Sequence, residues 1–539
     1  MIVFIFAFLS ILSVNTMVSG SNAAYSFNDL NGNYVDTISK PHKDPKLDYY
    51  LTSICRKENP SPSEDISLIN DGTNTLLIDI YLKEGCTKIE DLYPLIEDIR
   101  ASREGVIEAK IYKNRLISIR DLPYVSYISL PRRHYRDGIE VISEAANCTS
   151  DLMGICTYRN QGFDGDGIVV AVLDSEFYRD FSINRELPEK LVITSGSAYT
   201  PAERHGTACA ELVKDVAPNV TMYLIDIGET EQDFIIAMEN IMKLGQKIDV
   251  ISCSLDFRLG LFNEEDDVNK AVRNVTSSGT IWVNSAGNFA ERHWSGTFKD
   301  RDLDNYCDFA ENDESINLSA KRGELVRIWL NWDEDWHRAQ YDYDLYLYAP
   351  DNTYSSSNNP QQGYFGHKPA EFISMIAPTD GIYQIAIKKY KADNDITSFQ
   401  LFSSHRLNEY NVQNGSLGII SCSEDVITTG AVDIFTLKIE NSSSRGPTRN
   451  GKLKPDLVAP DNVSTMSYWP ERFIGTSSSA PYIAGCTALV LEKYGSASFS
   501  EIKAALMASC IDLGPKGPDY AYGYGLVNVD SIKEPYGGI

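Results

Sequence analysis

The spacing of apolar residues divides the chain into regions of different character. After Gly165, nearly continuous apolar runs alternate with stretches of helical periodicity. This alternation is typical of parallel strands that helices cover on both faces. The expected strands are Ile168–Leu173, Met222–Ile227, Val250–Leu255 and Thr280–Val283, and the expected helices lie near Thr207–Lys214, Glu231–Leu244, Val268–Ser277 and Tyr482–Leu491. We therefore predict an α/β fold with a doubly wound parallel sheet.

A second pattern interrupts this alternation between residues 295 and 411. Apolar and polar positions alternate with period two, and Gly, Pro, Asn and Asp separate the runs, as in antiparallel sheets. Strands are expected at Leu325–Trp332, Asp344–Tyr348, Tyr383–Ile387 and Ser398–Phe402. This segment is predicted to be an all-β sandwich inserted into the α/β domain, whose pattern resumes from about Gly415.

A small α+β pattern precedes the parallel sheet. Strands are expected at Leu76–Leu82, Val106–Tyr112, Leu116–Ile119 and Tyr124–Leu130. The spacing of Ile89, Leu92, Ile96 and Ile99 predicts a helix, although Pro94 interrupts it. The basic stretch Arg132, Arg133 and Arg136 is expected to be exposed.

The N-terminus has the pattern of a secretory signal peptide. The apolar run Met1–Val14 is shorter than the roughly 20 residues of a membrane span. Because no Lys or Arg precedes the run, an uncleaved anchor stays open as the alternative. We expect a secreted or cell-surface protein that associates with a membrane only if this segment is retained. The predicted organisation is a signal peptide at 1–20, an α+β region at 21–140 with its core at about 75–131, the α/β domain at 141–294 and 412–539, and the sandwich at 295–411.

Composition narrows the classes of function. The 539 residues are 43% hydrophobic and 23% charged, which excludes a wholly disordered or multi-span membrane protein. The net charge of −26 makes nucleic acid an unsuitable partner, because binding to phosphate depends on Lys and Arg. No cysteine or histidine cluster has the spacing of a metal site.

Three motifs in the α/β part carry candidate chemistry. Asp174 follows the apolar strand Ile168–Leu173, and the carboxyl ends of parallel strands are where sites form. His205 opens a helix within Arg204-His205-Gly206-Thr207. Ser477 lies in Gly475-Thr476-Ser477-Ser478-Ser479-Ala480-Pro481, at the start of another helix. Free N–H groups at a helix N-terminus suit a nucleophile that must form an oxyanion beside it.

The order Asp, His, Ser is that of subtilisin. With these motifs the chain resembles the subtilisin-like serine proteases, or subtilases. Further segments agree with that family over about 150–294 and 412–530. They are Val216-Ala217-Pro218, Ser285-Ala286-Gly287-Asn288, Ser443-Ser444-Arg445-Gly446-Pro447-Thr448, Lys454-Pro455-Asp456-Leu457-Val458-Ala459-Pro460 and Gly523-Tyr524-Gly525-Leu526-Val527.

The resemblance implies a role for each motif. Asp174, His205 and Ser477 would form the catalytic triad, and Asn288 would donate to the oxyanion. The substrate-lining residues would be Ser254, Leu255, Ser285, Ala286 and Gly287. The expected protein is a secreted serine endopeptidase that hydrolyses proteins and peptides through an acyl-enzyme. It would be made as a self-processing zymogen, in which the 21–140 region is a prodomain that occupies the cleft and is cleaved within 131–147.

The resemblance implies no cofactor for the chemistry and allows structural calcium. Asp342 and Asp344 are candidate oxygen ligands for that ion. The chain departs from the family at Glu176 and Asp256, where glycine is usual. Glu176 supports an alternative, a catalytically inactive subtilase fold that acts as a surface binding protein. A sedolisin-type acid peptidase is disfavoured, because that family has Glu where His205 stands.

Overall fold

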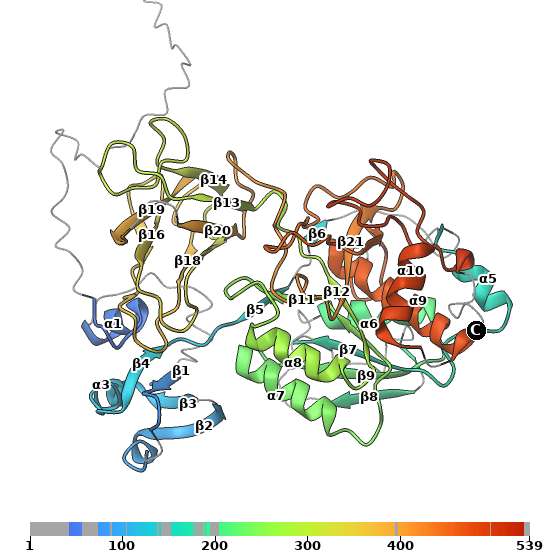
Figure 1. Ribbon diagram of the computed structural model, residues 1–539, viewed down its shortest axis with the longest axis horizontal. Helices are drawn as coiled ribbons and strands as arrows, with labels where there is room; N and C mark the ends of the chain where they lie inside the picture. The colour runs from blue at the N-terminus through green and yellow to red at the C-terminus, as the bar shows by residue number, and fades with distance from the viewer. Residues whose placement is uncertain are drawn as a thin grey trace, which may run out of the picture.

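The computed structural model describes residues 43–56, 74–86, 89–103, 105–136, 139–141, 152–175, 177, 187–188, 190–194, 204–393, 397–469, 471–495 and 497–532. Two groups of elements lie side by side in Figure 1. One group is the parallel α/β unit, and the other combines two antiparallel sheets with a small N-terminal sheet. The predicted signal peptide and Glu176 lie outside the described residues. Among the described residues, no helix has the length and apolar character needed to cross a membrane.

A seven-stranded parallel sheet forms the centre of the α/β unit, in the order β22-β21-β12-β10-β7-β9-β8. Every neighbouring pair in this sheet runs parallel. The strands are β7 (Val169–Asp174), β8 (Leu191–Thr194), β9 (Thr221–Asp226), β10 (Val250–Cys253), β12 (Ile281–Ser285), β21 (Ile427–Asp433) and β22 (Leu457–Asp461). The prediction of a parallel α/β sheet is confirmed.

Helices cover both faces of this sheet because alternate strand residues point to opposite sides. On β7, Val170 and Val172 join the core that contains α6 and α9, whereas Val169 and Ala171 join the core that contains α7 and α8. The helices of the α/β unit are α5 (Ile155–Asn160), α6 (His205–Val216), α7 (Glu231–Met242), α8 (Asp267–Thr276), α9 (Thr476–Tyr494) and α10 (Phe499–Ala508), with a 3-10 turn η3 (Val529–Ser531).

The chain between β12 and β21 forms two four-stranded antiparallel sheets that share one core. Their orders are β13-β20-β15-β18 and β14-β19-β16-β17. The strands are β13 (His293–Thr297), β14 (Ile316–Ala320), β15 (Leu325–Trp332), β16 (Asp342–Tyr348), β17 (Tyr354–Ser357), β18 (Ala370–Ile376), β19 (Gly381–Lys391) and β20 (Ser398–Ser403). We call these two sheets the sandwich.

The N-terminal sheet has the strand order β2-β3-β1-β4. Two sequence-based predictions in it are wrong. The helix expected from Ile89 to Ile99 is instead a 3-10 turn at Pro94 followed by a strand that pairs along one edge with β3, because proline ends helical hydrogen bonding. The strand expected at Leu116–Ile119 is a helical turn that buries Leu116 and Ile119. The elements are α1 (Tyr49–Arg56), β1 (Thr75–Leu82), η1 (Tyr93–Leu95), β2 (Ile96–Arg103), β3 (Val106–Tyr112), η2 (Lys113–Arg115), α3 (Leu116–Arg120) and β4 (Val125–Ser129).

Buried charges join the N-terminal sheet to the rest of the molecule. Arg132 was expected to be exposed, but it is only 6% exposed. Its guanidinium lies 2.6 Å from Glu231 and 3.0 Å from Asp266. Arg132 is buried because it lies between the N-terminal sheet and the α/β unit. The carboxylates of Asp342 and Asp344, which we considered for calcium, both contact the ammonium group of Lys43. Structural calcium therefore stays a prediction without an assigned ligand set.

Candidate active site

Asp174 and His205 lie at the carboxyl edge of the parallel sheet. Asp174 is the last residue of β7, and His205 is the first residue of α6. The His205 Nδ1 lies 2.6 Å from Asp174 Oδ2, and both side chains are buried. A carboxylate in this position keeps the proton on Nδ1 and leaves Nε2 as the basic nitrogen. Among the described residues, His205 Nε2 has no hydrogen-bond partner.

Ser477 is the second residue of α9 and follows a glycine in the left-handed region. Its hydroxyl donates to the carbonyl oxygen of Ser254 at 3.4 Å, and the Ser254 hydroxyl donates to the Ser477 carbonyl at 3.2 Å. The Cys209 thiol donates to the same carbonyl at 3.5 Å and lies within 4.8 Å of the Asp174 and His205 ligand atoms. The structure thus gathers Asp174, His205 and Ser477 around Cys209, with the Ser477 hydroxyl directed at Ser254.

Asn288 presents an amide group beside Ser477. Its Oδ1 accepts from the Thr476 backbone N–H at 3.1 Å, which fixes the orientation of the carboxamide because that N–H can only donate. Its Nδ2 is buried and has no partner among the described residues. An unpaired buried donor costs about 1–3 kcal/mol, so this amide is poised to donate to a ligand.

Two backbone segments flank Ser477. Ser254 and Leu255 follow β10, while Ser285 ends the neighbouring strand β12 and Ala286 and Gly287 follow it. The side chains of Leu255 and Ala286 join the core between the sheet, α7 and α8. Leu255 and Ala286 can therefore contact a ligand only through their backbone atoms. All five predicted substrate-lining residues are present in these two segments.

A stretch of the chain itself lies along both sides of Ser477. Strand β5 (His134–Arg136) pairs antiparallel with β11 (Leu255–Phe257), so that Arg136 is opposite Leu255. Strand β6 (Ile139–Val141) pairs antiparallel with β23 (Arg472–Ile474), which ends just before Gly475. This pairing was not predicted from the sequence, because short strands that pair over long separations leave no local periodicity.

Asp256 and Arg258, also on and beside β11, form a buried charged pair that the sequence analysis did not describe. Both side chains are fully buried, and they lie 3.8 Å apart. Asp256 also accepts from the backbone N–H groups of Ile420 at 2.8 Å and Ser421 at 3.1 Å. Burial raises the pKa of Asp256, although Arg258 and these donors oppose the shift. The signal in the sequence was the presence of two charges directly after a buried strand.

The chain is similar in sequence and fold to known proteins. The model of the subtilase family matches residues 165–322 and 403–525, just over half of the chain. The chain belongs to the subtilase family. The two matched blocks contain all nine predicted site residues.

Individual relatives match over shorter stretches. Subtilisin DY of Bacillus licheniformis is 30% identical over 115 residues, 21% of this chain and 38% of that protein. The serine protease AprX of Bacillus subtilis (strain 168) is 31% identical over 132 residues, 20% of this chain and 30% of that protein. The chain thus spans well under half the length of these curated relatives. A solved structure of the CspB protease of Clostridium perfringens superposes with a TM-score of 0.55 at 19% identity, over 72% of this chain and 98% of that one, which shows the shared fold.

Proposed function

We propose that this protein is a serine endopeptidase that hydrolyses peptide bonds in proteins. The observation that carries the proposal is the 2.6 Å contact between Asp174 and His205, which leaves His205 Nε2 without a partner beside the helix that bears Ser477. A serine hydroxyl is a weak nucleophile near neutral pH unless a base takes its proton. Rotation of the Ser477 hydroxyl away from Ser254 would bring it to that base.

The proposed reaction first forms an acyl-enzyme on Ser477 and then hydrolyses it. Ser477 Oγ bonds to the scissile carbonyl carbon while His205 Nε2 takes the hydroxyl proton. Asp174 stabilises the imidazolium that forms. The carbon–nitrogen bond then breaks, and His205 returns the proton to the leaving amine. In the second half of the reaction, His205 takes a proton from water as the water oxygen bonds to the acyl carbon. The bond between that carbon and Ser477 Oγ then breaks, and His205 returns the proton to Ser477.

Asn288 is proposed to stabilise the oxyanion of each tetrahedral intermediate. The Thr476 N–H donates to Asn288 Oδ1 and so fixes the direction in which Nδ2 of the same carboxamide points. The backbone N–H of Ser477, in the first turn of α9, would be the second donor. Fixed donors of this kind need no reorganisation when charge develops on the substrate oxygen.

We infer further that the protein is made as a zymogen that cleaves itself. The support is the pairing of His134–Arg136 with β11 on one side of Ser477 and of Ile139–Val141 with β23 on the other. Antiparallel pairing is how an extended substrate binds an exposed strand. The chain would be cut between Asp137 and Ile139, and the part before the cut would be the prodomain. Secretion, expected from the first 20 residues, belongs to the same proposal.

Labelling and mass measurements test both parts. A fluorophosphonate probe should label full-length protein at Ser477, and Ser477→Ala should abolish both labelling and casein hydrolysis. Intact mass after incubation should show a new N-terminus at Gly138 or Ile139 in the wild type and no cleavage in Ser477→Ala. Absence of labelling in both proteins would refute the peptidase. Labelling of Ser477 together with a first residue before His134 or after Val141 would refute only the self-cleavage.

A further inference from the structure

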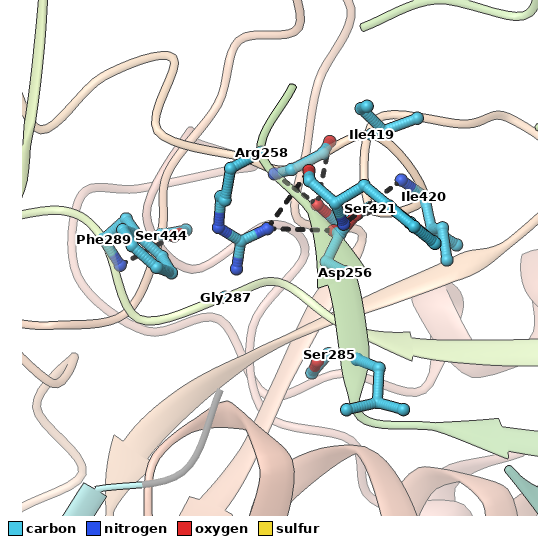
Figure 2. A network of polar contacts seen from close by, with 12 residues as sticks. Asp256, Arg258, Ser285, Gly287, Phe289, Ile419, Ile420, Ser421 and Ser444 are labelled. Atoms are coloured by element: carbon cyan, nitrogen blue, oxygen red, sulfur yellow. Dashed lines mark hydrogen bonds and ion pairs between the residues drawn. The ribbon is translucent and has the colours of Figure 1, made fainter. Parts of the chain in front are cut away.

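A buried arginine lies in the gap between the two segments that flank Ser477. Figure 2 shows Arg258 between Asp256, on β11, and Phe289, which follows the segment Ser285–Asn288. The guanidinium carbon lies 4.0 Å from the centre of the Phe289 ring, and the Arg258 side chain is fully buried. Arg258 therefore spans from one flanking segment to the other.

Asp256 and its neighbours hold this arginine in place. The Asp256 carboxylate lies 3.8 Å from Arg258 Nη1. The same carboxylate accepts from the backbone N–H groups of Phe257 and Ile420, both at 2.8 Å. These contacts fix Asp256 against the 417–421 segment, so the arginine it faces has a defined position. The resemblance to the subtilases predicts glycine at position 256, and a glycine there would give Arg258 no carboxylate partner.

Two glycines show how completely the arginine fills the gap. A Cβ atom added at Gly287 would lie 3.4 Å from Arg258 Nη2 and 3.0 Å from Ser444 Oγ. A Cβ atom added at Gly418 would overlap both Arg258 Nη1 and the Asp256 carboxyl group. A side chain at Gly418 would therefore overlap the arginine, and one at Gly287 would press against it.

The path of a bound strand brings one substrate residue to this gap. β5 shows the path, with Arg136 opposite Leu255 and Tyr135 opposite Asp256. The next residue toward Ser477 must place its carbonyl between Ser477 and Asn288 for the proposed reaction. Its side chain then extends between the Ser254–Leu255 and Ser285–Gly287 segments, which is the gap that Arg258 fills.

We propose that Arg258, held by Asp256, restricts the residue on the acyl side of the cleaved bond to a short side chain. This inference rests on the proposed peptidase function and specifies its substrates. A long aliphatic or aromatic side chain overlaps the guanidinium, and a basic side chain is in addition repelled by its charge. Peptides that place a short side chain at this position, such as Gly, Ala, Ser or Asp, are the expected substrates; in the chain itself the residue after Arg136 is Asp137.

The test is a series of peptides, succinyl-Ala-Ala-X-p-nitroanilide, in which X is Ala, Phe or Lys. Full-length protein is used after incubation, with active sites counted by fluorophosphonate labelling. We expect kcat/KM for X = Ala to exceed that for Phe or Lys by about 100-fold. Comparable values for Ala and Phe on labelled enzyme would overturn the inference and leave the peptidase standing. Failure of labelling would overturn the peptidase itself and the inference with it.

Variants at Arg258 separate the effect of its side-chain volume on substrate preference from the effect of its charge. Removing the arginine alone leaves the Asp256 carboxylate buried without its charged partner. The two residues are therefore changed together, as Arg258→Ala with Asp256→Asn. This double variant should raise the Phe-to-Ala ratio of kcat/KM about tenfold. Arg258→Met, again combined with Asp256→Asn, keeps the volume and removes the charge, so it should still reject Phe while it improves the Lys-to-Ala ratio. A Met variant that accepts Phe as readily as the Arg258→Ala double variant, or an Arg258→Ala double variant with an unchanged ratio, would overturn the inference.

Discussion

The ammonium nitrogen of Lys43 lies 2.5 Å from Asp342 Oδ1, although 299 residues separate them in the chain. It lies at the same distance from Asp344 Oδ1 and donates to the Asn359 carbonyl at 3.0 Å. The three charged side chains are no more than 4% exposed. One lysine thus compensates two buried carboxylates where the chain before the N-terminal sheet meets the sandwich.

We predict that Lys43→Met strongly destabilises the full-length chain. Two carboxylates would remain buried without a cation, at a cost of about 3–5 kcal/mol. The measurement is chemical unfolding in a Ser477→Ala background, which removes self-cleavage. Asp342→Asn with Asp344→Asn should restore most of the loss. Lys46→Met is the control, because Lys46 donates only to the Arg120 and Leu122 carbonyls, and the two asparagines should not rescue it.

Arg132 and Arg133 provide a comparison of neighbouring ion pairs. Arg132 contacts Glu231 and Asp266 in a buried setting, whereas Arg133 contacts Glu229, which is 53% exposed. Arg132→Ala should lower the free energy of unfolding by about 3–5 kcal/mol. Arg133→Ala should lower it by less than about 1 kcal/mol, because water screens an exposed pair. Equal losses measured by urea unfolding of the two variants would contradict the assigned burial.

The N-terminal sheet should lose stability as pH rises above the ordinary carboxyl range. Asp79 and Glu108 are opposite each other on β1 and β3, both buried where the sheet meets α7. Burial raises both pKa values; Lys368 and Arg132 oppose the shift at Asp79, while Glu231 adds to it. At Glu108, Asp79 and Asp233 raise the pKa further, and Thr230 and Arg100 oppose it.

The stability falls with rising pH because the folded protein binds more protons than the unfolded chain. Above about pH 4 the unfolded carboxyl groups have released protons that the folded ones still hold, so stability falls as pH rises until the folded groups also ionise. Hydrogen exchange of β1 and β3 in the Ser477→Ala protein should therefore be faster, after correction for intrinsic rates, at pH 8 than at pH 5. Asp79→Asn with Glu108→Gln should flatten this dependence. Glu97→Gln, at an exposed site on β2, should leave it unchanged.

Asn288→Ala should lower kcat by about 100- to 1000-fold with little change in KM, since its free amide would act only when the oxyanion forms. The assay is peptide hydrolysis normalised to fluorophosphonate-reactive sites. Asn284→Ala is the matched control. Asn284 is also buried, but it bonds to Trp282 and to the Ser285 carbonyl. The control should lower the thermal midpoint without a comparable fall in kcat. A similar fall in both variants would count against the oxyanion role.

Local patterns were sufficient for the elements that carry the candidate chemistry. Asp174 and His205 mark a strand end and a helix start, and both are positions where apolar periodicity changes in the sequence. The same patterns failed at Leu116–Arg120, where five residues fit a strand or a helical turn equally well. They also failed for the edge strand β2, whose exposed residues have no alternating burial to reveal it.

The sequence by itself determined the strands and helices that carry the three subtilase-like motifs and the parallel α/β class, because each depends on residues close together in the chain. Only the tertiary structure decided that Lys43 meets Asp342, that Arg132 is buried, that β5 and β6 pair beside Ser477 and that Arg258 packs against Phe289. These relationships join residues from distant segments. Burial and charge pairing across such distances arise from packing, which no local periodicity records.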